Sequence, residues 1–251
     1  MASSPDFGGR TVALTGAAGA YGRDLALSFQ RLGARLLLSD RTAEAGISLP
    51  ADSYRYLQAD LSALEGVEAL ADWLLADGVP DVLVNNAGLF PFVDLMDVSP
   101  ESFEAVLGVN LRAPWRLMQR VGAAMAQRGS GAICNISSGA ASVVRENGAI
   151  YGASKAALEH LTRAFAVRLG PAGVRVNAVR PGLRTDTRQP MGAEHLRRVG
   201  TTAPLARLAR DGEVASVVVF LCSEAASFVT GEVIAADGGN GINRRSPAPP
   251  A

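Results

Sequence analysis

The chain has 251 residues, with 24 basic and 24 acidic side chains, so its formal net charge is zero. This balance gives no electrostatic reason to expect a nucleic-acid or acidic membrane partner. The two histidines leave little material for a zinc site, so we expect no metal. Cys134 and Cys222 lie in apolar runs, no apolar stretch is long enough to span a bilayer, and no leader pattern is recognisable. We therefore expect a soluble, cytoplasmic protein with reduced cysteines.

Alternating strand and helix signals predict one domain over residues 10–240, between a disordered lead-in at 1–9 and a disordered tail at 241–251. A polar, proline-containing stretch at 183–210 has little regular pattern and is expected to form a substrate lid. Seven strands alternating with helices predict an α/β, doubly wound parallel sheet with helices on both faces. Strands are expected at 11–15, 34–39, 54–59, 81–85, 131–136, 174–179 and 232–236. Helices are expected from 22 to 32, at 64–76, at 100–128, around Tyr151 and at 211–223.

The first strand runs into a turn that contains Gly16, Gly19 and Gly22 and opens a helix. Such a turn lets backbone amides and a helix N-terminus approach a pyrophosphate. Asp40 ends the second strand, where a carboxylate can accept hydrogen bonds from an adenosine ribose and repel a 2′-phosphate. Arg41 could instead hold that phosphate. We give Asp40 more weight, so NAD is expected and NADP stays possible.

Tyr151 and Lys155 are four residues apart in a strong helix-forming segment, so their side chains share one helix face. A phenol is a weak acid or base at neutral pH unless its phenolate is stabilised, and a neighbouring ammonium can do that. Taken alone, the pair is better explained as an exposed tyrosine and lysine on an ordinary amphipathic helix, because such pairs are common by accident.

The complete set of motifs resembles the short-chain dehydrogenase/reductase family over nearly the whole chain. The matching residues are Thr15-Gly16, Gly22, Asp60, Asn85-Asn86-Ala87-Gly88, Asn110, Ser138, Tyr151, Lys155 and Pro181-Gly182. The resemblance implies a Rossmann domain with strand order 3-2-1-4-5-6-7. It also implies an enzyme that interconverts a secondary alcohol and a ketone by hydride transfer to or from a nicotinamide.

The family pattern then suggests catalytic roles. Tyr151 is expected to be the general acid/base, and Lys155 to lower its pKa and hold the nicotinamide ribose. Ser138, thirteen residues before Tyr151, is expected to bind the substrate oxygen. Asn110 is expected to keep a water in line with Lys155, although it could also be a kink or a backbone-bonding residue of its helix.

The same pattern assigns cofactor contacts to the glycine turn, the strand ends and the segment after the sixth strand. These are Gly16, Gly19, Tyr21, Gly22, Asp40, Arg41, Asp60, Leu61, Asn86, Ala87, Gly88, Tyr151, Lys155, Pro181, Gly182, Leu183 and Thr185, with Asn85 more structural. Two departures from the family limit the transfer. Ala20 and Tyr21 replace the usual glycine and aliphatic residue. Arg184 and Asp186 replace an aliphatic residue and a threonine, so a one-residue deletion is needed to put Thr185 in the threonine role.

Substrate contacts are placed only by their nearness to these motifs. The candidates are Phe90, Phe92, Val144, Arg145, Glu146, Arg184, Met191 and His195. Apolar outer positions such as Leu117, Leu158 and Phe165, on helices that pair across subunits in this family, lead us to expect a homo-oligomer, tetramer or dimer. A non-catalytic NAD-binding regulator is one alternative, and a nucleotide-sugar epimerase or dehydratase is another. The intact Ser138, Tyr151 and Lys155 set speaks against the regulator, and the compact length speaks against the nucleotide-sugar enzyme.

Overall fold

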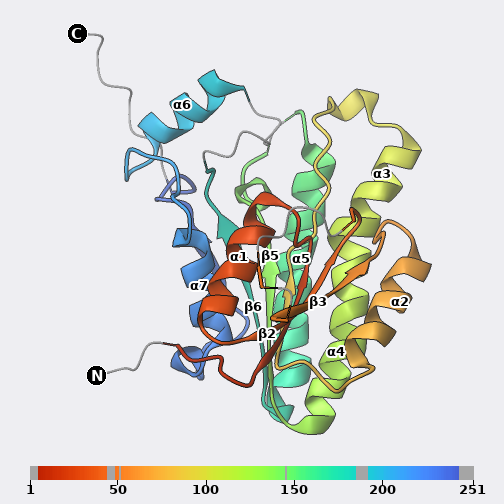
Figure 1. The fold of residues 1–251 in the computed structure, drawn as a ribbon. Coiled ribbons are helices and arrows are strands. Elements are labelled where there is room, and N and C mark those ends of the chain that lie inside the picture. Colours follow the sequence, from red (N-terminus) through yellow and green to blue (C-terminus); the bar gives the residue numbers. More distant parts are fainter. Residues whose placement is uncertain (1–4, 44–48, 51, 145, 185–191, 243–251) are drawn as a thin grey trace.

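A computed structural model describes residues 5–43, 49–50, 52–144, 146–184 and 192–242. Its seven strands form one parallel sheet in the order β3-β2-β1-β4-β5-β6-β7, which confirms the predicted fold class and strand order (Figure 1). In the described residues, no helix is both long and apolar enough to cross a bilayer. The strands are β1 (Thr11–Thr15), β2 (Arg35–Asp40), β3 (Tyr54–Gln58), β4 (Val82–Asn85), β5 (Gly131–Ile136), β6 (Val174–Pro181) and β7 (Val233–Ala236).

Helices cover both faces of the sheet, and each face has its own apolar core (Figure 1). One core lies beneath α1 and α7, and the other beneath α2, α4 and α5. This arrangement explains why the central strands read as continuous apolar runs, since they are buried on both sides. The helices are α1 (Ala20–Arg31), α2 (Leu64–Leu75), α3 (Pro100–Leu107), α4 (Ala113–Arg128), α5 (Ala149–Leu169), α6 (Ala193–Thr202) and α7 (Glu213–Cys222).

The helix expected at residues 100–128 is helical throughout, but an unexpected π-helical segment at Gly108–Arg112 divides it into α3 and α4. A π-turn holds one more residue than an α-turn, and such turns often mark functional sites. Here the turn contains Asn110, which is fully buried. Ser99 begins α3 as expected, by accepting a hydrogen bond from the Ser102 amide.

Three other expectations need correction. The expectation of a disordered lead-in is wrong at Phe7. Its amide donates a hydrogen bond to the Leu32 carbonyl, and its buried ring packs edge-on against Phe29. Burying an aromatic ring outweighs the cost of ordering this short segment. The stretch at 183–210 contains α6, whose first turn follows Gly192 without a side-chain cap and so gave no start signal. Leu117 and Leu158 are core residues rather than outer positions.

Candidate functional site

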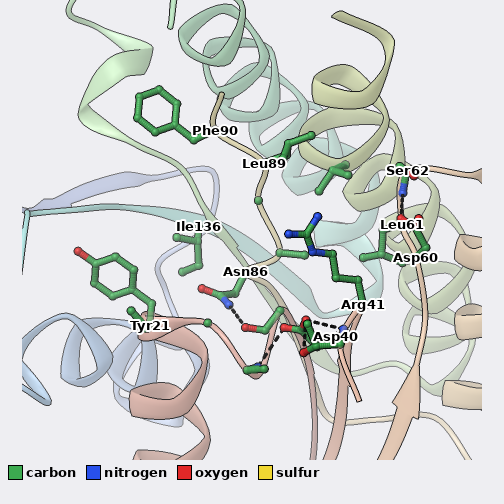
Figure 2. Close-up of a pocket in the computed structure, with 18 of the residues that line it drawn as sticks. Tyr21, Asp40, Arg41, Asp60, Leu61, Ser62, Asn86, Leu89, Phe90 and Ile136 are labelled. Atoms are coloured by element: carbon green, nitrogen blue, oxygen red, sulfur yellow. Dashed lines mark hydrogen bonds between the residues drawn. The ribbon is translucent and has the colours of Figure 1, made fainter. Parts of the chain in front are cut away.

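A cavity of about 870 Å³ opens at the carboxyl ends of the strands (Figure 2). It lies around the point where the strand order reverses, because β2 and β3 follow β1 on one side and β4 begins the other side. This is where ligands bind in open parallel α/β sheets. The structure brings most of the predicted site residues together on its walls. They are Gly16, Gly19, Tyr21, Asp40, Arg41, Asp60, Leu61, Asn86, Ala87, Gly88, Phe90, Tyr151, Lys155 and Pro181.

The glycine turn leaves no room for side chains at two of its positions. Gly16 has a φ of +67°, and a Cβ there would lie 2.7 Å from the Ala87 Cα. A Cβ on Gly22 would lie 2.0 Å from the Gly16 carbonyl oxygen. Helix α1 begins just after Gly19 without a side-chain cap, so its first amides point out of the helix end. A pyrophosphate fits such a turn, because amides and the helix dipole both favour an anion.

The end of β4 is held against this turn by Thr15 and Asn86. The Thr15 hydroxyl accepts hydrogen bonds from the Asn86 and Ala87 amides, at 3.0 and 3.1 Å. The Asn86 side chain donates to the carbonyls of Thr15 and Gly16. Asn85 is structural, as expected, since its amide group donates to Asn135 across the strands at 2.8 Å. The bonding role of the Thr15 side chain was missed, although its place before Gly16 is a usable signal.

Asp40 and Arg41 have different surroundings in the cavity. The Asp40 carboxylate accepts hydrogen bonds from the Ala18 amide at 3.0 Å and from the Thr42 amide and hydroxyl at 3.1 Å. These bonds fix a negative charge beside the glycine turn. The Arg41 side chain extends away from Asp40 into the cavity (Figure 2). Two hydrogen bonds with Ser62 lower the pKa of Asp60, and the Arg41 charge adds to this effect.

Tyr151 and Lys155 lie on the cavity side of α5, as their spacing predicts. The Lys155 Nζ is 5.7 Å from the centre of the Tyr151 ring and donates to the Ile136 carbonyl at 2.8 Å. Burial lowers the pKa of Lys155 to about 8. Burial also raises the pKa of Tyr151, and a hydrogen bond with Ser138 partly opposes that rise. The phenol, the ammonium and the Ser138 hydroxyl therefore form one local group.

Asn110 is a backbone-bonding residue, one of the two roles considered for it. Its side chain exchanges two hydrogen bonds with the Leu89 backbone, at 2.8 and 2.9 Å, and donates to Ser154 at 3.1 Å. The π-turn thereby ties the segment after β4 to α5. A Cβ on Gly88 would lie 3.6 Å from the Asn110 Oδ1 and 3.7 Å from the Lys155 Nζ. The absence of that side chain leaves space between Asn110 and Lys155.

Tyr21 and Arg184, which both depart from the family pattern, contact each other. The Tyr21 hydroxyl donates to the Gly182 carbonyl, and the Arg184 guanidinium lies 5.7 Å from the Tyr21 ring centre. Arg184 also donates to the Ala20 carbonyl and to Asp211. Two nitrogens of the Arg184 guanidinium therefore hold the chain after β6 against α1, and contact of Arg184 with the substrate stays a prediction. Burial raises the pKa of Tyr21.

The remaining candidates are more scattered. Phe90 packs against Tyr151, with ring centres 4.5 Å apart, and Phe92 packs edge-on against Phe90. Val144 is 93% exposed. His195 lies on α6, where it contacts Arg198. Leu183 lines a second cavity beside α6 and α7. Gly22 and Gly182 do not line the main cavity; they pack closely against Gly16 and Asp237. Arg145, Thr185 and Met191 lie outside the described residues.

Comparisons with known proteins agree with this geometry. A family model described as enoyl-(acyl carrier protein) reductase matches residues 16–240. Galactitol 2-dehydrogenase (L-tagatose-forming) of Cereibacter sphaeroides is 34% identical over 241 residues, covering 92% of this chain and 94% of that protein. L-xylulose reductase of Mesocricetus auratus is 35% identical over 253 residues, covering 92% of this chain and 96% of the reductase.

A solved structure shows the same fold. The gluconate 5-dehydrogenase from Burkholderia cenocepacia J2315, in complex with NADP and tartrate, aligns with a TM-score of 0.86 and 28% identity. The alignment covers 94% of this chain and 96% of that one. The matches span the glycine turn, the strand ends and the Tyr151 helix. The chain therefore belongs to the short-chain dehydrogenase/reductase family of oxidoreductases.

Proposed function

We propose that this protein interconverts a secondary alcohol and a ketone, with a nicotinamide dinucleotide as the hydride carrier. The observation that carries the proposal is the group formed by Tyr151, Lys155 and Ser138, in which Tyr151 and the buried Lys155 line a cavity shaped for a dinucleotide. A protein that only binds a dinucleotide has no need of a phenol beside an ammonium. Relatives named for oxidation or reduction of galactitol and L-xylulose support the same reaction class.

Tyr151 is the proposed proton-transfer group. In alcohol oxidation its phenolate takes the hydroxyl proton of the substrate, and in ketone reduction its phenol returns that proton. When bound, the nicotinamide supplies the site that accepts or donates the hydride. Ser138 donates a hydrogen bond to the substrate oxygen and so holds it next to Tyr151. That bond is worth most when negative charge builds up on the oxygen.

Lys155 favours the phenolate form of Tyr151. Burial alone raises the pKa of Tyr151, which makes it a poorer base. A protonated Lys155, with its Nζ 5.7 Å from the ring centre, stabilises the phenolate by charge attraction. Because burial lowers the pKa of Lys155 to about 8, the ammonium can also release its proton in the working pH range. We propose that the space left by Gly88 holds a water that links Lys155 to Asn110 in that transfer.

The residues of the glycine turn would hold the pyrophosphate, Asp40 the adenosine ribose, and Asp60 with Leu61 the adenine. NAD is the proposed cofactor, because the fixed Asp40 carboxylate would repel a 2′-phosphate. The Arg41 side chain extends away from Asp40, which supports the same preference (Figure 2). The NADP in the gluconate 5-dehydrogenase structure makes NADP the competing cofactor in any test.

The substrate side of the site is mainly Phe90, whose ring lies against Tyr151. An apolar ring there suits the carbon skeleton of a small or medium alcohol. We further propose a cytoplasmic homo-oligomer. Exposed apolar side chains on α3, α4 and α5, namely Phe103, Trp115 and Val167, support an association surface. The two free, buried cysteines suit a reducing compartment.

The test is a panel of secondary alcohols and ketones followed by NADH absorbance, with NADP(H) in parallel. The proposal predicts turnover of at least one pair, with a higher kcat/KM for NAD than for NADP. A purified protein that binds neither cofactor, by calorimetry at millimolar concentration, contradicts the proposal. A preference for NADP contradicts only the role given to Asp40.

A further inference from the structure

A buried ion pair lies behind the catalytic wall and has no part in the chemistry described above. Arg180, at the end of β6, donates to both carboxylate oxygens of Glu159 on α5, from Nε at 2.7 Å and from Nη2 at 2.6 Å. The Glu159 side chain is 5% exposed. A carboxylate so deeply buried is stable only with a partner of good geometry, and the two-pronged guanidinium supplies it.

The same carboxylate is bonded to the catalytic wall itself. The Ser137 hydroxyl, at the end of β5, donates to the Glu159 Oε1 at 2.6 Å. Ser137 comes directly before Ser138, and its own amide donates to the Val179 carbonyl of β6 at 2.8 Å. Ser137 is therefore held from both its side chain and its backbone. Because the two serines are consecutive, fixing the Ser137 backbone also places Ser138, whose hydroxyl accepts a hydrogen bond from the Ala140 amide at 3.2 Å.

Three segments of the site thus meet at one buried charge. Helix α5 carries Tyr151, Lys155 and Glu159 at successive four-residue steps, so all three lie on one helix face. Strand β5 contributes Ser137 and the Ile136 carbonyl that accepts from Lys155. Strand β6 contributes Arg180, which directly precedes the Pro181 of the cavity wall. A shift of any one segment stretches a charge-assisted hydrogen bond, and such bonds are roughly twice as strong as neutral ones.

We propose that Arg180, Glu159 and Ser137 form a positioning network that orients Ser138 toward Tyr151. The inference rests on the proposed function, since it concerns the proton transfer at that same site. Arg180 and Glu159 do not line the cavity, and the hydroxyl of Ser137, which does, is bonded to Glu159. The three residues act through Ser138, whose hydrogen bond stabilises the Tyr151 phenolate.

The readout is the pH profile of alcohol oxidation, in which Tyr151 must be deprotonated. Charged or titratable neighbours of Tyr151 are Lys155 on its own helix and Tyr21 from α1. Arg180 itself faces Glu159 and Asp237, and also donates weakly to Ser142. Arg180→Ala should raise the midpoint of the profile by roughly one pH unit, because the hydrogen bond from Ser138 to the charged phenolate oxygen of Tyr151 is weakened. Arg180→Lys keeps the charge but loses the two-pronged geometry, so its shift should be smaller.

A matched control lies on α4 and α2, which pack on the same face of the sheet as α5. Arg116 of α4 binds Glu68 of α2 with the same two nitrogens, Nε and Nη2, and its side chain is 27% exposed, as is that of Arg180. Arg116→Ala should lower the melting temperature without moving the pH midpoint. A purely structural role for Arg180 predicts the same outcome for Arg180→Ala. The proposal predicts a shifted midpoint instead.

The decisive step is to repeat Arg180→Ala in a Ser138→Ala background. If Arg180 acts through Ser138, the second substitution adds little to the shift caused by the first. Additive shifts, or an unchanged midpoint in Arg180→Ala, overturn the network. Should Arg180→Ala fail to fold, Ser137→Ala keeps the ion pair, cuts only its link to β5 and should move the midpoint in the same direction. An active Tyr151→Phe protein would instead overturn the proposed function, and with it this inference.

Discussion

Replacing Lys155 by methionine should stabilise the cofactor-free protein at neutral pH. Lys155 is the only lysine in the chain, and 3% of it is exposed. Burial lowers its pKa from 10.5 to about 8, so keeping it protonated in the folded state costs about 3 kcal/mol at neutral pH. Methionine has nearly the same length and no charge. It also loses the hydrogen bond to the Ile136 carbonyl, which offsets about 1 kcal/mol of the gain.

The sign of the pH dependence follows from linkage. The folded pKa lies below the unfolded one, so between them the unfolded chain binds more protons. The stability of the wild type therefore rises with pH through the window from about 8 to 10.5. The variant lacks this group, so its lead of about 2 kcal/mol at pH 7 should nearly vanish by about pH 9.5. The pH range of this comparison lies below the titration of Tyr151, because burial raises the pKa of that phenol.

The assay is denaturant unfolding of both proteins across this pH range, followed by tryptophan fluorescence. Other titrating groups cancel in the difference between the two free energies of unfolding. The single lysine permits a direct check, since protein labelled with ¹³C-lysine gives one side-chain signal, whose titration should have a midpoint near pH 8. A difference that stays constant from pH 7 to about pH 9.5, together with a lysine signal that does not titrate there, would refute the reasoning.

Two further predictions concern the cofactor end of the cavity. Asp40→Ala should raise kcat/KM for NADP relative to NAD by about tenfold or more, and Asp40→Asn should do the same while keeping a hydrogen-bonding group beside Ala18. An unchanged ratio in steady-state assays would remove Asp40 from cofactor selection. Gly22→Ala should destabilise the fold by several kcal/mol, because its Cβ would lie 2.0 Å from the Gly16 carbonyl oxygen. Gly19→Ala, at 3.3 Å from the same atom, should cost far less, and equal losses in thermal melts would contradict the close packing.

The sequence was most informative where a local rule fixes the geometry. A four-residue step places Tyr151 and Lys155 on one helix face whatever surrounds them. Parallel strands bring their carboxyl ends to one edge, so residues such as Gly16, Asp40 and Asn86 had to meet there. These parts of the site were predictable because each depends on one element and its end.

Other parts depend on contacts between segments far apart in the chain. The Arg180–Glu159 pair joins β6 to α5 across a turn, and each residue alone reads as a surface charge. The partners of Arg184 on α1 and at Asp211 could not be predicted, because they are distant from it in sequence. Helix α6 was missed because Gly192 offers no cap, and Phe7 because a lone aromatic among polar residues gives no periodic signal.

The central claim is that the Tyr151 phenol moves the substrate proton, and one comparison tests it most directly. Turnover and NAD affinity are measured for the wild type and for Tyr151→Phe on a substrate pair found in the alcohol and ketone panel. The account predicts at least a 100-fold loss of kcat, the size expected for removal of a general acid/base, with NAD affinity nearly unchanged. A Tyr151→Phe protein that keeps full turnover would contradict it.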